Sequence, residues 1–128
     1  LTISAPDLAK LVSLLANDGA YEGVSYLSPE SVAEMERAQF TVDPGDTSPF
    51  DQCLILRRQE DLLGRDQLYY HTGSAYGVYS LLSYDPDTGD GVVVITTGAP
   101  RQVDQRGLYA LPARLSERLY EEMEARRP

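Results

Sequence analysis

Residues that carry metal-binding and basic chemistry are scarce in this chain. Its 128 residues include one cysteine, one histidine and one lysine, and 20 acidic residues against 11 Lys and Arg give a formal net charge of −9. The single cysteine, Cys53, excludes an internal disulfide and a cysteine-rich zinc site. The shortage of positive charge argues against nucleic acid or an anionic membrane as a partner, because both need clustered Lys and Arg.

Several recognisable functional segments are also missing. No apolar run approaches the roughly 20 residues that cross a bilayer. The chain has no Walker-type loop, dinucleotide glycine fingerprint or G-x-S-x-G elbow, so we expect neither a cofactor nor a metal. Its length and its apolar fraction of 42% predict one globular domain over residues 1–128. Because the chain starts at Leu1 and a helix begins almost at once, we expect it to be part of a longer protein.

Capping signals predict two helices in the first part of the chain. Ser4 is typical of an N-cap, and Gly19 is typical of the stop at the helix C-terminus. Ser28 followed by Pro29 marks the start of a second helix. The segment 40–51 is rich in turn residues, which predicts a loop.

The rest of the chain reads as strands followed by a helix. The predicted strands are CLILRR (53–58), QLYYHT (67–72), YGVYSLLSY (76–84) and GVVVITT (91–97). DPDTGD (85–90) reads as a tight turn between the last two strands. The closing helix carries apolar residues on one side: Leu108, Leu111, Leu115, Leu119 and Met123. We therefore predict an α+β fold, an antiparallel meander of three or four strands with flanking helices that cover one face.

The only histidine opens the candidate site, His71-Thr72-Gly73-Ser74. Glycine at a strand edge lets a ligand or another backbone come close, and an exposed Ser74 N–H could serve as an oxyanion donor or pair with a peptide-like substrate. The alternative is an ordinary histidine at the end of a strand. The tyrosines of this region are expected to pack on the sheet: Tyr69, Tyr70, Tyr76 and Tyr79. Cys53 is expected to be a small buried residue, and Arg57–Arg58 a solvated strand end.

The segment HTGSAYGVYSLLSYDPDTGDGVVVITTG (71–98) resembles the C-terminal hairpin region of the serine β-lactamase and penicillin-binding protein family, in its class C and D-alanyl-D-alanine peptidase-like branch. That family has a K-T-G or H-x-G triad, a glycine-started strand, a D-P-x-T-G turn and a Val-rich strand. The upstream segment ISAPDLAKLVSLLANDGAYEGVSYLSPESVAEM (3–35) is similar to the family's preceding helices. The similarity covers nearly the whole chain in the family's order.

The resemblance implies a role for each residue of the triad region. His71, Thr72 and Gly73 would form the third catalytic motif, which binds the substrate carboxylate, and the Ser74 N–H would join the oxyanion hole. The substrate would be a β-lactam, a D-alanyl peptide or a small ester. Family members are commonly exported, although this chain shows no export signal.

The chain departs from the family where the nucleophile and base should be. The only lysine, Lys10, has Asp7 three residues before it, so no S-x-x-K motif is present. The only asparagine, Asn17, lacks the Tyr or Ser of the second motif, and Thr97–Gly98 replaces a common asparagine. The chain alone is therefore expected to be inactive.

Three interpretations stay open from the sequence. The chain is the C-terminal portion of a serine hydrolase whose missing N-terminal portion holds the nucleophile, or a non-catalytic binding domain derived from that fold, or an unrelated α+β domain. Loss of the N-terminal strands would expose an edge of the sheet, from which we expect a homodimer.

Overall fold

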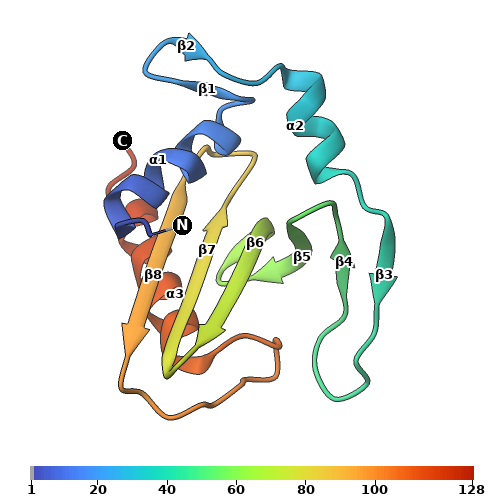
Figure 1. Cartoon of the computed structure of the whole chain (residues 1–128), viewed down its shortest axis with the longest axis vertical. Helices are drawn as coiled ribbons and strands as arrows, with labels where there is room; N and C mark the ends of the chain where they lie inside the picture. The colour runs from blue at the N-terminus through green and yellow to red at the C-terminus, as the bar shows by residue number, and fades with distance from the viewer. Residues whose placement is uncertain (1) are drawn as a thin grey trace.

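A computed structural model describes residues 2–128 of the chain. Its centre is a six-stranded antiparallel sheet in the order β3-β4-β5-β6-β7-β8 (Figure 1). These strands are β3 (Phe40–Val42), β4 (Phe50–Gln52), β5 (Arg57–Leu62), β6 (Arg65–Ala75), β7 (Val78–Tyr84) and β8 (Gly91–Thr97). A separate two-stranded sheet pairs β1 (Ala20–Tyr21) with β2 (Val24–Ser25). The predicted α+β class is confirmed, but the sheet is wider than the three or four strands predicted.

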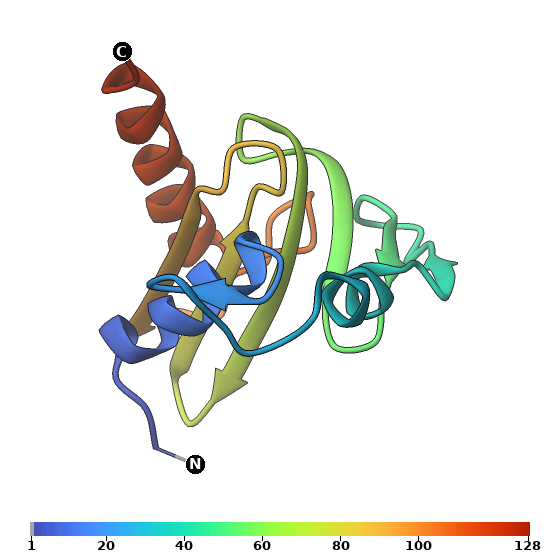
Figure 2. The same ribbon diagram turned by 90° about the horizontal axis from the view of Figure 1, so that it is seen from above.

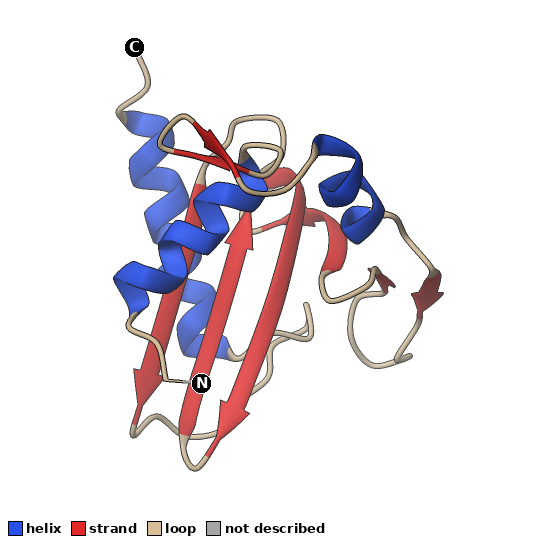
Figure 3. Cartoon of the chain, turned by 45° about the horizontal axis from the view of Figure 1, so that its top comes forward, coloured by secondary structure: helices blue, strands red, loops and turns tan. Residues whose placement is uncertain are grey.

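Helices cover both faces of the main sheet, and the prediction of one covered face is wrong. The helices are α1 (Ala5–Ala16), α2 (Pro29–Glu36) and α3 (Ala110–Ala125). Figures 2 and 3 show α1 and α2 on one side of the sheet and α3 on the other. We call these sides the α1 face and the α3 face. Along β8, Val92 and Val94 pack in the cluster of α3, whereas Val93 packs against that of α1.

The two predicted helix starts are confirmed by their caps. Ser4 accepts a 3.2 Å hydrogen bond from the Asp7 N–H, and Ser28 accepts one of the same length from the Ser31 N–H. Gly19 follows α1 with a φ of +88°, where a Cβ would lie 2.4 Å from the Leu27 carbonyl oxygen. Glycine is therefore required at this helix end for both conformation and space.

Two predictions in the middle of the chain, one of a loop and one of a strand, are wrong. The predicted loop over 40–51 is a hairpin, because β3 and β4 pair across the turn residues that dominate its sequence. The segment CLIL was predicted as a strand but forms a turn, and β5 begins only at Arg57. There Cys53 donates its N–H to the Leu56 carbonyl, which closes the turn at 2.9 Å.

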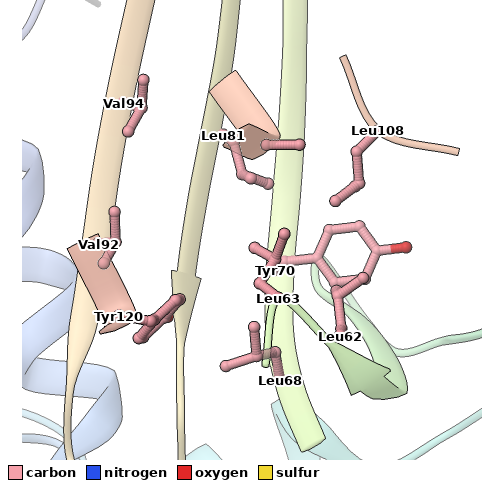
Figure 4. Packing of buried hydrophobic residues seen from close by; sticks show 10 residues of the cluster. Leu62, Leu63, Leu68, Tyr70, Leu81, Val92, Val94, Leu108 and Tyr120 are labelled. Atoms are coloured by element: carbon pink, nitrogen blue, oxygen red, sulfur yellow. The ribbon is translucent and has the colours of Figure 1, made fainter. Parts of the chain in front are cut away.

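The core on the α3 face holds the sheet and the closing helix together. Tyr70, Leu81 and Val94 of adjacent strands pack there with Tyr120 of α3 (Figure 4). Burial raises the pKa of Tyr70 to about 12, so its hydroxyl stays protonated and donates to Gln59 at 3.1 Å. The predicted turn at 85–90 is also confirmed, since the Asp85 carboxylate accepts N–H bonds from Asp87 and Thr88.

The closing helix buries a different side from the one its leucines suggested. It starts at Ala110, so Pro112 falls in the first turn, where a missing N–H costs no helical hydrogen bond. The buried positions of α3 are Pro112, Ala113, Ser116 and Tyr120. The leucines 111, 115 and 119 remain exposed. No helix in residues 2–128 is both long enough and apolar enough to span a membrane.

Candidate functional site at the open edge of β6

Strand β6 is longer than the neighbour that pairs with it on one side. Its pairing with β7 runs from Tyr69 to Ala75, whereas its pairing with β5 ends where Arg57 meets Tyr70. Residues 71–75 therefore have a strand on one side only, and within residues 2–128 no strand pairs with them on the other. This open stretch contains the whole His71–Ser74 segment.

The hairpin turn fixes which peptide groups face the open side. Tyr76 and Gly77 have φ values of +50° and +78°, as in a two-residue type I′ turn, so Ala75 and Val78 form its hydrogen-bonded closing pair. In an antiparallel ladder such pairs alternate with pairs that direct their peptide groups away. Thr72 and Ser74 consequently turn their N–H and C=O groups toward the open side.

The side chains of the segment alternate between the two faces. Tyr69 belongs to the cluster of the α1 face and Tyr70 to that of the α3 face. By the period of two along a strand, His71 lies on the α1 face and Thr72 on the α3 face. The predicted site residues thus share one strand segment, but they do not all face one cavity.

An apolar cleft of about 180 Å³ lies on the α1 face beside His71. Its walls come from α1, the turn before β5, and strands β6 and β7. The lining residues are Leu11, Val12, Leu15, Ile55, Leu56, His71 and Leu82. His71 is the only titratable side chain among them, and it is exposed. The sequence predicted a site at His71. It did not predict this cleft, because the leucines that line the cleft lie far apart in the chain.

Gly73 is explained by its cross-strand partner. A Cβ at this position would lie 2.5 Å from the Ser80 Oγ, so the Ser80 side chain occupies the space over the glycine. The Ser80 hydroxyl therefore fills the α1-facing space that a side chain at residue 73 would take. An extended ligand on the open edge would meet no side chain at residue 73.

The α1 face also holds a polar contact that the sequence did not suggest. The Tyr84 hydroxyl donates a 2.7 Å hydrogen bond to the Glu36 carboxylate, and the Tyr84 ring stacks on Tyr69 with centroids 5.5 Å apart. Partial burial raises the pKa of Glu36, and the Tyr84 hydrogen bond offsets part of that rise. Cys53 lies alongside, buried as predicted, and donates from Sγ to the Glu36 carbonyl oxygen.

Two other sequence expectations for this region are wrong. Tyr76 does not pack on the sheet, because it occupies the β6–β7 turn and is fully exposed. Arg57–Arg58 is not a solvated strand end: Arg58 pairs with Asp51 at 2.5 Å, and the Arg57 guanidinium lies 4.4 Å from the centroid of the Phe50 ring. Both arginines instead hold β5 to β4 at the place where β5 stops covering β6.

Lys10, the only lysine of the chain, is not placed to act as a base. The ammonium group of Lys10 lies on exposed α1, 2.8 Å from Asp7. The hydrogen bond to that carboxylate raises the pKa of Lys10, the opposite of what a general base requires. Residues 2–128 also contain no group of three His, Cys, Asp or Glu side chains placed to hold a metal ion.

Comparisons with known proteins leave the chain without an assigned relative. No family model, curated protein or solved structure matches it.

Proposed function

We propose that this chain forms the substrate-binding wall of a β-lactamase-like serine hydrolase, which acts by acyl transfer on a β-lactam, a D-alanyl peptide or a small ester. The observation that carries the proposal is the open edge of β6 at His71–Ser74. It coincides with the segment in which the sequence resembles the family's third catalytic motif.

The open edge suits an amide or lactam substrate. The N–H and C=O groups of Thr72 and Ser74 face outward, so an extended substrate can pair with them as an added strand. A carbonyl held against the Ser74 N–H would have its developing negative charge stabilised during acyl transfer. Loss of one such donor from an oxyanion hole costs about 10²–10³ in rate.

His71 and Thr72 place different functional groups on the two faces of the open edge. His71 borders the apolar cleft of the α1 face, whereas the Thr72 hydroxyl lies on the α3 face. The resemblance assigns both residues to binding of the substrate carboxylate. With one on each face, a carboxylate at the strand edge would lie between an imidazole and a hydroxyl.

The chemistry of bond cleavage has to come from another polypeptide segment. The resemblance places the nucleophilic serine and its lysine in a portion N-terminal to this chain. We therefore propose that the chain binds substrate and does not hydrolyse it alone.

A non-catalytic binding domain is the second candidate. The same edge supports it, because an unpaired strand binds extended peptides through the main chain without any nucleophile. Both candidates require the outward N–H of Ser74, and they differ in whether an N-terminal portion restores hydrolysis.

The test compares two substitutions at one position. Ser74→Pro removes the outward N–H without removing a ladder bond, since proline is tolerated on a free strand edge, and Ser74→Ala retains the N–H. Binding of diacetyl-L-lysyl-D-alanyl-D-alanine is measured by calorimetry, with nitrocefin hydrolysis followed in parallel. We expect wild type and Ser74→Ala to bind, Ser74→Pro to bind at least about tenfold more weakly, and none to hydrolyse. Equal binding by Ser74→Pro would refute the role of the edge.

A further inference from the structure

The last strand of the main sheet, β8, has an unprotected edge. It is seven residues long and pairs with β7 along its whole length, but within residues 2–128 it has no partner on the other side. The β6–β7 turn fixes which pairs are hydrogen-bonded, and this alternation continues across β7 to β8. As a result, the peptide groups that point away from β7 are those of Gly91, Val93, Ile95 and Thr97. The strand contains no charge and no proline, the devices that usually protect an edge from pairing.

Helix α3 leaves a row of leucines exposed beside this edge. Leu111, Leu115 and Leu119 follow one another at intervals of four, so they form one stripe along the helix. Each has slightly over 40% of its surface exposed, as has Ile95 of β8. Water-facing leucines in a row, next to a valine-rich edge strand, are typical of an interface.

The edge and the stripe meet in one groove. A surface groove between them is lined by Val93, Val94, Ile95, Leu115 and Leu119, among others. Val94 is the central residue of β8, packs on the α3 face, and lines this groove together with Leu115 and Leu119. An axis at Val94 would therefore bring the β8 edges and the exposed leucines of two copies together.

We propose that two copies of this chain associate about a two-fold axis at Val94. The two β8 strands would pair antiparallel, which joins the main sheets into one, and the two α3 helices would pack antiparallel on the same face. With Val94 opposite itself, all outward groups of β8 pair: Val93 with Ile95 and Gly91 with Thr97 of the second copy. Such a contact is closed and self-complementary, as a two-fold interface must be.

The charges along α3 also fit a second copy of the same helix. Arg114 lies in its N-terminal half, and Glu121 and Glu122 lie in its C-terminal half. Antiparallel packing places Arg114 of one copy opposite Glu121 of the other. No ion pair of Arg114 is found within residues 2–128, whereas Glu121 already pairs with Arg118 of its own helix at 2.9 Å, so Arg114 of the second copy would join that pair. A strand of an unrelated protein could also pair with β8, but such pairing would not depend on the order of positive and negative residues along α3.

The proposed interface is separate from the open edge of β6, because β7 lies between the two strands. The mass in solution is measured by light scattering from micromolar to millimolar protein. We expect twice the monomer mass at the upper end. Leu115→Lys, and Ile95→Pro, which removes one outward N–H, should each weaken association by at least about tenfold. Leu54→Lys, at an exposed leucine far from the groove, is the matched control and should associate like wild type.

A charge exchange tests the orientation. Arg114→Glu alone and Glu121→Arg alone should each associate more weakly than wild type, and an equimolar mixture of the two variants should form the heterodimer preferentially. A wild-type monomer at every concentration would overturn the proposal. Association unaffected by Leu115→Lys and Ile95→Pro would overturn it as well, since another surface or another polypeptide would then be the partner.

Discussion

The Tyr84 hydroxyl donates a 2.7 Å hydrogen bond to the Glu36 carboxylate, and this contact joins β7 to the last residue of α2. Tyr84 is fully buried, whereas Glu36 is only partly so. The bond therefore fixes α2 against the α1 face, on which His71 and its cleft also lie. A second side-chain hydrogen bond, from Cys53 Sγ to the Glu36 carbonyl oxygen, ties the same end of α2 to the turn before β5.

This contact predicts how stability depends on pH. Burial raises the pKa of Glu36, so the folded protein holds this proton more tightly than the unfolded chain does. The contribution of Glu36 to the free energy of unfolding should fall as the pH rises from the ordinary glutamate pKa, about 4.3, through the raised folded value. Glu36→Gln keeps an acceptor for Tyr84 but cannot ionise, so its stability relative to wild type should increase across that window. Urea unfolding at a series of pH values measures this difference, and a pH-independent difference would contradict the assignment.

The buried Arg65 predicts a large loss of stability on substitution. Its guanidinium lies 3.2 Å from Asp90, 3.0 Å from Glu124 and 3.6 Å from Asp85. Arg65→Met would leave these carboxylates facing one another at a site where Arg65 and Asp85 are both buried, and should cost about 3 kcal/mol.

Arg118→Met provides the control for that experiment. Arg118 also contacts two carboxylates, but on the exposed side of α3. Its loss should cost less than about 0.5 kcal/mol. Equal effects of the two substitutions in chemical denaturation would mean that Arg65 is not a buried anchor between α3 and the turns of the sheet.

Gly73 predicts a pair of compensating substitutions. Gly73→Ala would bring a methyl group 2.5 Å from the Ser80 Oγ and should destabilise the protein by about 1 kcal/mol. Ser80→Ala removes that oxygen, and the remaining Ser80 Cβ lies 3.8 Å away, an ordinary contact distance. Thermal unfolding of the single and double variants should show that most of the loss is recovered in the double variant. If the stability effects of the two substitutions simply add, then glycine is needed at residue 73 for its backbone conformation and not for the contact with Ser80.

The parts of the fold with local signals could be predicted from the sequence. The caps at Ser4 and Ser28 and the turn at Asp85 depend on residues within three positions of one another, and all three were predicted correctly. The order of the β6, β7 and β8 strands was likewise readable, because each is bounded by turn residues and rich in residues that favour strands.

Features that depend on distant contacts were not predictable. The hairpin of β3 and β4 has only three residues in each strand, and β4 also pairs with β5, a contact that the local sequence does not show. In α3, helical spacing favoured Leu111, Leu115 and Leu119 as the buried side, yet the smaller Ala113 and Ser116 allow the helix to lie close to the sheet. The candidate site was found from its motif, but its open edge follows from where β5 ends, which the sequence did not indicate.

The central claim is that the outward peptide groups of Thr72 and Ser74 bind an extended acyl-amide substrate. Amide chemical shifts and hydrogen exchange of ¹⁵N-labelled protein, titrated with diacetyl-L-lysyl-D-alanyl-D-alanine, test it residue by residue. We predict that the largest shifts and new exchange protection occur at Thr72 and Ser74. Changes confined to the β8 edge at Val93 and Ile95, or no changes at all, would contradict the claim.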